Sequence, residues 1–198
     1  MREADIRPQD LLNEYLRLSA ADARDFFTDP RHFENRPCPG CGADAPMLLF
    51  AKNGFDVVVC ADCDSRYVNP APKEKVLDDF YRDSPSTRYW ANVFFPAVAE
   101  ARRERIFRPR AQKIGAMLTG LEKRVIDVGA GYGLLLEEVQ DLEPDYAVRA
   151  VEPGTDLAAV CRAKNIETFE GFAHDAATDP DWNGWANLVT SFEVIEHV

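Results

Sequence analysis

Short apolar runs alternate with helix-like stretches over the second half of the chain. The apolar runs lie at 124–128, 147–152, 166–170 and 187–192. Two stretches between them, 133–141 and 155–164, place apolar residues at helical spacing. Short apolar runs are typical of buried strands, and strands that alternate with helices form parallel sheets covered by helices. We therefore predict an α/β fold with a doubly wound sheet of four parallel strands.

The first half of the chain has a different pattern. Residues 5–28 place apolar side chains at helical spacing, which predicts one or two amphipathic helices. Apolar runs at 47–50 and 55–59 flank Asn53-Gly54, a pair typical of a tight hairpin turn. A third short strand is expected at 66–68. These runs predict a small antiparallel sheet.

Helical patterns return after this sheet, at 73–82 and at about 97–118. Pro109 is expected to kink or split the longer helix, because proline lacks an N–H and clashes with the preceding turn. We divide the chain into four parts: an N-terminal helical segment (1–35), a four-cysteine module (36–72), a helical lead-in (73–122) and the N-terminal part of a Rossmann-like domain (123–198).

Charge and composition narrow the function classes. The chain has 198 residues, 46% of them hydrophobic, and no apolar run near the roughly 20 residues of a membrane span. The N-terminus has no apolar signal region, so a cytoplasmic location without membrane partners is expected. The net charge is −11, and residues 125–198 carry 3 basic and 15 acidic groups, which argues against nucleic-acid binding there. The basic stretch 101–113 is either a solvated helix face or a contact for an anionic substrate.

Three glycines follow the first strand of the predicted parallel sheet. Gly129, Gly131 and Gly133 lie where this strand turns into a helix, and a ligand can approach the main chain closely there. Asp127 precedes the first glycine by two positions, and Glu152 follows the last by nineteen, at the end of the second strand. A carboxylate there can accept hydrogen bonds from ribose hydroxyls. The spacing differs from G-x-G-x-x-G, which favours a nucleoside without a diphosphate.

The turn D-x-G-x-G-x-G, the acidic end of the second strand and the segment SFEVIEHV (191–198) resemble class I S-adenosylmethionine-dependent methyltransferases over about residues 85–198. The resemblance implies the strand order 3-2-1-4, with S-adenosylmethionine as cofactor. In it the glycine turn holds the methionine part, Glu152 the ribose, and residues 171–175 flank the adenine. The implied cofactor-binding residues are Asp127, Gly129, Ala130, Gly131, Gly133, Glu152, Phe172, Ala173, Phe192 and Glu193.

Two of these assignments have alternatives. Phe192 is expected either to border the cofactor or to be an ordinary core aromatic. Glu193, Glu196 and His197 could together ligate a second divalent cation, since carboxylate and imidazole are suitable ligands. Some methyltransferases with a similar segment use it for a metal, and others carry it without one.

Four cysteines form two C-x2-C pairs: Cys38 with Cys41, and Cys60 with Cys63. Eighteen residues separate the pairs, a spacing typical of a tetrahedral four-cysteine zinc site. Four thiolates close the coordination sphere, so the zinc is expected to be structural. The alternative, a redox dithiol, needs one pair only. Cys161 is predicted to be a small buried residue of a helix.

A four-cysteine module before a methyltransferase domain resembles the zinc-containing bacterial methyltransferases that include sugar C-methyltransferases. This implies methyl transfer to a small molecule, such as a nucleotide-linked sugar or related metabolite. The alternatives are a non-catalytic zinc-binding interaction protein with a vestigial Rossmann half and, disfavoured by the acidic charge, an RNA methyltransferase. The family's sheet has seven strands, so we expect an N-terminal fragment that is not active alone. No catalytic residue and no oligomeric state are assigned.

Overall fold

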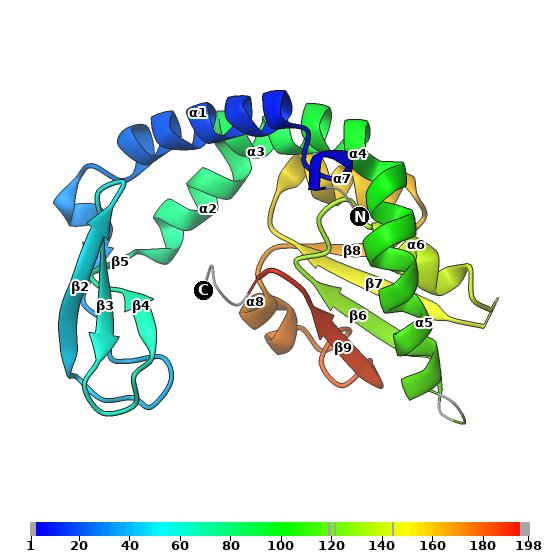
Figure 1. The fold of residues 1–198 in the computed structure, drawn as a ribbon. Helices are drawn as coiled ribbons and strands as arrows, with labels where there is room; N and C mark the ends of the chain where they lie inside the picture. The colour runs from blue at the N-terminus through cyan, green and yellow to red at the C-terminus, as the bar shows by residue number, and fades with distance from the viewer. Residues whose placement is uncertain (1–2, 119, 121, 144, 195–198) are drawn as a thin grey trace. The chain divides into compact units, whose positions relative to one another are not determined.

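A computed structural model describes residues 3–118, 120, 122–143 and 145–194 (Figure 1). Its contacts divide the chain into two compact units, Glu14–Ser86 and Met1–Asn13 with Thr87–Val198. The four-part division expected from the sequence is finer than this and stays a prediction. In the described ranges, no helix combines the length and apolar character that a membrane crossing needs.

The smaller unit contains two antiparallel sheets and parts of the flanking helices. Its elements are α1 (Gln9–Phe26, which begins before the unit), η2 (Pro30–His32), β1 (Phe33–Glu34), β2 (Pro46–Lys52), β3 (Phe55–Cys60), β4 (Arg66–Val68), β5 (Ala71–Pro72) and α2 (Glu74–Asp83). β2, β3 and β4 form one sheet in that order, and β1 pairs with β5. Asn53 and Gly54 both adopt positive φ, 54° and 87°, so the predicted tight hairpin turn between β2 and β3 is confirmed.

Aromatic side chains hold the helices of this unit to its strands. The ring of Phe27, just after α1, lies 5.2 Å from that of Phe55 on β3 and 5.4 Å from that of Phe80 on α2. Asp22 is fully buried, and one of its carboxylate oxygens accepts the Ser86 N–H at 2.9 Å. A small unit with little apolar core therefore uses ring packing between elements that are distant in the sequence.

The larger unit contains the parallel sheet. Its strands are β6 (Arg124–Val128), β7 (Ala147–Glu152), β8 (Glu167–Glu170) and β9 (Leu188–Ser191), and they lie in the order β8-β7-β6-β9 (Figure 1). Numbered along the chain within this sheet, that order is 3-2-1-4, and every pairing is parallel. The carboxyl ends of all four strands therefore meet at one edge.

Helices cover both faces of this sheet. On one face, α5 (Arg108–Met117), α6 (Leu134–Gln140) and α7 (Thr155–Ala163) enclose a core that includes Val125, Leu136 and Cys161. On the other face, α8 (Ala173–Thr178) packs through Ala176 on Ile126 and Val151. Neighbouring strand residues such as Val125 and Ile126 enter opposite cores, as a doubly covered parallel sheet requires.

A helical run precedes the sheet: α3 (Pro85–Tyr89), the π-helical turn η3 (Trp90–Phe94), α4 (Phe95–Arg102), the π-helical turn η4 (Arg103–Phe107) and α5. A short 3-10 turn, η1 (Glu3–Asp5), opens the unit. The expected break at Pro109 is displaced. The irregularity is η4, which ends before Arg108, and Pro109 lies in the first turn of α5. Pro96 follows η3 in the same way. A widened turn accommodates a proline that cannot donate to the preceding helix.

Leu136 tests the core beneath α6. Its side chain is 0% exposed, so Leu136→Ala leaves a cavity and is expected to lower the free energy of unfolding by about 2–5 kcal/mol. Chemical denaturation measures this change. The matched control is Met117→Ala on α5, because Met117 is 66% exposed, and it is expected to stay within about 0.5 kcal/mol of the wild type. Equal losses in the two variants would contradict the assigned core.

Candidate functional site

The loop between β6 and α6 is built on three glycines with left-handed backbone. Gly129, Gly131 and Gly133 have φ values of 71°, 57° and 72°, which side chains with a Cβ disfavour. The Gly129 N–H donates to Val151 O at 2.8 Å, so the loop begins bound to the neighbouring strand. A Cβ on Gly133 would lie 3.1 Å from Cys161 Sγ. The three glycines of the sequence pattern therefore lie at the three positions where the backbone of this loop favours glycine.

Gly131 is at the open part of this loop. A Cβ built on it would meet one neighbour within 4 Å, the oxygen of Gly129 at 4.0 Å. A side chain at Gly131 would thus occupy free space beside the loop. Ala130, next to it, packs against the core on the α6 side of the sheet. The loop is anchored at its ends and exposes its backbone at Gly131.

Glu152, the last residue of β7, links this loop to the second strand. Its side chain is buried, and Oε2 accepts the Gly131 N–H at 2.7 Å while Oε1 accepts the Gly154 N–H at 2.9 Å. Burial raises the pKa of Glu152, against the two backbone hydrogen bonds, which favour the ionised form. A carboxylate has about four acceptor positions, so each oxygen can take a further donor.

Asp127 lies inside β6 and is also buried. The Thr190 hydroxyl of β9 donates to its Oδ1 at 2.7 Å. Burial, with a smaller effect from the charge of Glu152, raises the pKa of Asp127 to about 7, while the bond from Thr190 and the positive charge of Arg110 oppose the rise. Neither Asp127 nor Glu152 has an ion-pair partner within the ranges that the structure describes. Two neighbouring buried carboxyls thus share a site in which Arg110 offsets their charge only from a distance.

The remaining cofactor candidates follow β8 and β9. Phe172 caps α8, and its ring stacks on that of His174 with centroids 5.8 Å apart. Ala173 begins α8, so the last three residues of the stretch 171–175 are helical. Phe192 packs against the core at its edge, and the Arg110 guanidinium lies 4.2 Å from its ring centroid. Both interpretations of Phe192, core aromatic and cofactor border, stay open.

Glu193 has a positive φ of 59° and lies 3.6 Å from Arg110. Glu196 and His197, the other candidate ligands of a second cation, fall outside the described residues. The sequence did not single out Tyr132, whose ring stacks on Phe95 at 5.5 Å and lies 4.2 Å from Lys164 Nζ. A lone aromatic between two glycines carries no signal of this contact. The signal for Arg110 was the basic stretch that contains it.

The four cysteines of the two C-x2-C pairs come together in the smaller unit, and their sulfur atoms all lie within 4.8 Å of one another. Gly42 and Asp64 each lie four residues after the first cysteine of a pair, have positive φ, and donate their N–H to that cysteine's carbonyl. The hydroxyl and N–H of Ser65 lower the pKa of Cys63 to about 6, which favours its thiolate. Four converging sulfurs could hold one metal ion. Cys161 is buried in α7, as predicted.

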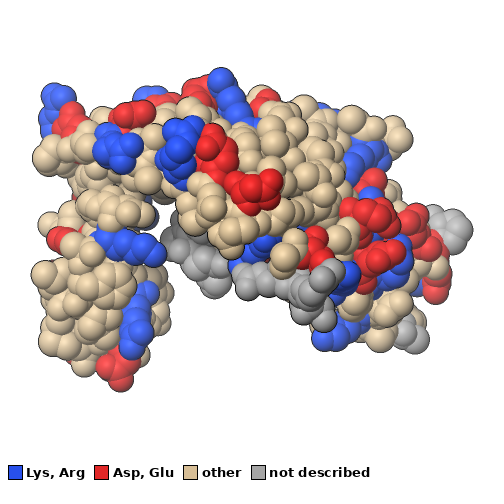
Figure 2. All heavy atoms as spheres, turned by 45° about the horizontal axis from the view of Figure 1, so that its top comes forward, with Lys and Arg blue, Asp and Glu red and all other residues tan. Residues whose placement is uncertain are grey.

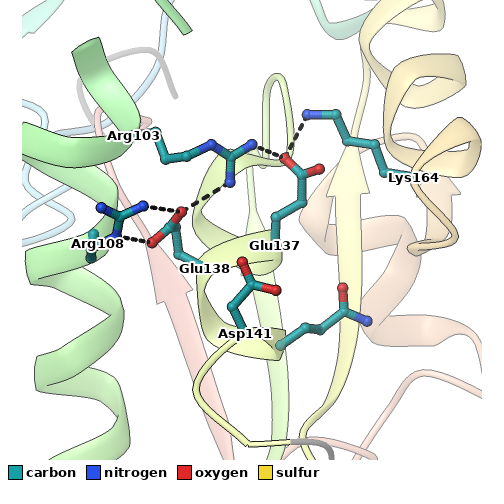
Figure 3. Close-up of a pocket in the computed structure, with 7 residues that line it drawn as sticks. Arg103, Arg108, Glu137, Glu138, Asp141 and Lys164 are labelled. Atoms are coloured by element: carbon teal, nitrogen blue, oxygen red, sulfur yellow. Dashed lines mark hydrogen bonds and ion pairs between the residues drawn. The ribbon is translucent and has the colours of Figure 1, made fainter. Parts of the chain in front are cut away.

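A polar hollow of about 450 Å³ lies elsewhere on the larger unit (Figure 3). Arg103 donates to Glu137 and Glu138 at 2.7 and 3.0 Å, Arg108 donates to Glu138 at 2.9 Å, and Lys164 donates to Glu137 at 2.8 Å. Acidic and basic side chains also lie intermixed on the surface in Figure 2. These ion pairs join α6 to η4, α5 and Lys164. Lys164 also donates to the carbonyl oxygen of Tyr132 at 2.7 Å, so one side of the hollow meets the glycine loop.

No protein-family model matches the chain, and no curated protein does. Among solved structures, the chain is similar to a proposed S-adenosyl-L-methionine-dependent methyltransferase from Methanococcus maripaludis, with a TM-score of 0.42 and 18% identity over 51% of this chain and 48% of that chain. It is also similar to the plantazolicin methyltransferase in complex with SAH, with a TM-score of 0.36 and 14% identity over 46% and 36%. The chain thus spans about half or less of each.

Asp127 makes the stability of the fold depend on pH. Its pKa is raised in the folded state, so between about pH 4 and pH 7 the folded chain binds a proton that the unfolded chain has lost. The contribution of this group to the free energy of unfolding is therefore highest at low pH and falls as the pH rises to 7, by an amount on the order of 4 kcal/mol. Asp127→Asn keeps an acceptor for Thr190 and is expected to lose less stability across this range in chemical denaturation.

The control for this measurement is Asp175→Asn, which changes an exposed carboxyl on α8. It is expected to follow the wild-type dependence on pH. Parallel curves for wild type and Asp127→Asn would show that Asp127 is not the group that titrates.

Proposed function

We propose that the larger unit binds S-adenosylmethionine at the carboxyl edge of its sheet and is part of a methyltransferase that acts on a small molecule. The observation that carries the proposal is the link between Glu152 and Gly131. It places a buried carboxylate at the end of the second strand directly beside an open glycine loop. A nucleoside ligand needs both features, a bonding partner for its ribose and a backbone that it can approach.

The acceptor positions left on Glu152 support the ribose part of this proposal. Each of its oxygens already accepts one backbone N–H, from Gly131 or Gly154, and this fixes the orientation of the carboxylate. Two vicinal hydroxyls can donate to the positions that remain. A ligand that fixes two hydroxyls in this way loses little further freedom, because the carboxylate is already held.

The charge of the site supports a cationic ligand. Asp127 and Glu152 are buried neighbours with raised pKa values, so negative charge there is unfavourable in the unliganded chain. S-adenosylmethionine carries a sulfonium and an ammonium. When bound, it would supply a methyl group whose carbon is electrophilic because it is bonded to the sulfonium. The residues of this chain would bind and orient it, while Phe172, Ala173, Phe192 and Glu193 would border it. No residue described here is assigned as the base for an acceptor.

We further propose that the four-cysteine group holds a structural zinc ion. Four sulfurs fill the tetrahedral coordination that zinc prefers, which leaves no position for a substrate. The smaller unit has a limited apolar core, and a metal would stabilise it. Two further parts of the proposal rest on the resemblance to the bacterial group that includes sugar C-methyltransferases. They are the order of the modules, zinc module first and methyltransferase domain second, and the acceptor, a nucleotide-linked sugar or related metabolite.

One observation favours a second candidate function, a zinc-binding interaction module without catalysis. β2 lies at the edge of its sheet and exposes four consecutive apolar side chains, each 45–68% exposed: Met47, Leu48, Leu49 and Phe50. Exposed apolar edge strands are typical of pairing surfaces. A chain that keeps its metal but binds no S-adenosylhomocysteine would favour this function over methyl transfer.

Calorimetric titration with S-adenosylhomocysteine tests the cofactor site. The wild type is expected to bind saturably. Glu152→Gln, which removes charge and an acceptor position, is expected to weaken binding about tenfold or more, and Gly131→Val to abolish it by filling the open space. The control is Glu170→Gln at the end of β8, where the carboxylate bonds Thr155 and Arg162, and it should bind within about twofold of the wild type. Absence of binding by the wild type would refute the proposal.

Metal analysis tests the cysteine group. The purified chain is expected to contain one zinc ion per molecule, and Cys38→Ser is expected to lower zinc content and the melting temperature of the smaller unit. Cys161→Ser changes a cysteine outside the group and should retain the metal. If the two single variants Cys38→Ser and Cys41→Ser both retained the full zinc content, a four-cysteine site would be excluded.

A further inference from the structure

The arginines of the helical run fall into two sets with different surroundings. Arg103 and Arg108 are paired with Glu137 and Glu138 of α6, at distances of 2.7–3.0 Å. Arg102 and Arg110 instead lie around one aromatic ring, with their guanidinium carbons 5.9 and 6.0 Å from the centroid of Phe107. The first set joins helices through ion pairs, whereas in the second set the ion pair that the described residues show is a longer one, between Arg110 and Glu193 at 3.6 Å.

Arg102 is half-buried and incompletely bonded. Its guanidinium carbon lies 5.3 Å from the ring centroid of Phe95, and its buried Nε has no hydrogen-bond partner in the described part of the chain. Burial and the positive charges of Arg7 and Arg110 lower the pKa of Arg102, and Glu193 opposes them. A buried donor without an acceptor is unfavourable, and an anion that reached it would relieve both the missing bond and the repulsion.

Arg110 is held in place from two sides. Its guanidinium stacks on Phe192 at 4.2 Å and lies 3.6 Å from Glu193, whose side chain is 69% exposed. Stacking fixes the plane of the guanidinium and leaves its edge N–H groups for a ligand. Within the described ranges, Arg110 forms an ion pair with one carboxylate, that of Glu193. Positive charge is therefore in excess in the arginine cluster, which consists of Arg102 and Arg110.

This cluster borders the proposed cofactor site. Phe192 and Glu193 directly follow β9, at the carboxyl edge of the sheet. The ring of Phe95, which contacts the Arg102 guanidinium, stacks on the ring of Tyr132. Tyr132 lies between Gly131 and Gly133 in the glycine loop. The acceptor of a transferred methyl group must lie beside the donor. An anionic group on that acceptor would therefore come within reach of the two guanidiniums.

We propose that Arg102 and Arg110 form a subsite for an oxyanion group, a phosphate or a carboxylate, on the methyl acceptor. This subsite rests on the proposed function of the larger unit. The planar fork of each guanidinium matches two oxygens of such a group, and neighbouring aromatic rings fix the fork before the ligand arrives. The acceptor class is thereby narrowed to small molecules that carry a negative charge near the methylated atom.

Calorimetry on the full chain tests the subsite with two probes, inorganic pyrophosphate and malonate, each added to protein saturated with S-adenosylhomocysteine. At least one probe is expected to bind saturably, and the tighter one identifies the group as phosphoryl or carboxylate. Arg102→Gln and Arg110→Gln are each expected to weaken that binding about tenfold. The matched control is Lys113→Gln, which removes one positive charge from an exposed position of α5 and should stay within about twofold of the wild type.

Three results would overturn the subsite. Neither probe binds, or Lys113→Gln weakens binding as much as the arginine variants, which indicates diffuse attraction to a basic surface. Alternatively, the arginine variants lose affinity for S-adenosylhomocysteine itself, which assigns the guanidiniums to the cofactor. All three leave the cofactor site standing, whereas a wild type that binds no S-adenosylhomocysteine refutes the proposed function. Arg110→Gln removes a partly exposed side chain and keeps the test usable if Arg102→Gln unfolds.

Discussion

The hydrogen bond from the Gly131 N–H to Glu152 holds the candidate site together. At 2.7 Å it joins the loop after β6 to the end of β7, and the second oxygen of the same carboxylate receives the N–H of Gly154, which precedes α7. One buried side chain thus fixes the path of the glycine loop and the start of the next helix. Asp127 lies beside it, and burial raises the pKa of both carboxyls. A site that keeps two such groups close together sacrifices stability, which is common where a ligand later supplies the missing charge.

Much of this arrangement could be predicted from local sequence. The bounds of β6 and β7 agree with the apolar runs, because a strand buried on both faces must be apolar throughout its length. The glycine loop was predictable because backbone angles with positive φ are a property of single residues. The same holds for Asn53-Gly54, whose hairpin turn needs positive φ twice. The convergence of four cysteines could be inferred from spacing alone, since each pair forms a knuckle.

The features that escaped prediction depend on contacts between distant residues. Thr190 donates to Asp127 across 63 positions of sequence, and no local pattern indicates this partner. The basic stretch could not be divided into paired and unpaired arginines, because the division depends on which helix face meets α6. The paired Arg103 also lies in the π-helical turn η4, which a periodicity of 3.6 residues does not describe. α8 is a single short helix with one buried residue, Ala176, and it leaves almost no hydrophobic pattern.

The central claim is that a nucleoside cofactor binds at the glycine loop beside Glu152. Mapping of backbone amide NMR signals during titration with S-adenosylhomocysteine tests it most directly. The proposed site predicts saturable shifts concentrated at Gly129, Gly131 and Gly133, with further shifts near Glu152 and at the start of α8. Shifts confined to the polar hollow around Glu138, or no shift at a saturating concentration, would contradict the claim.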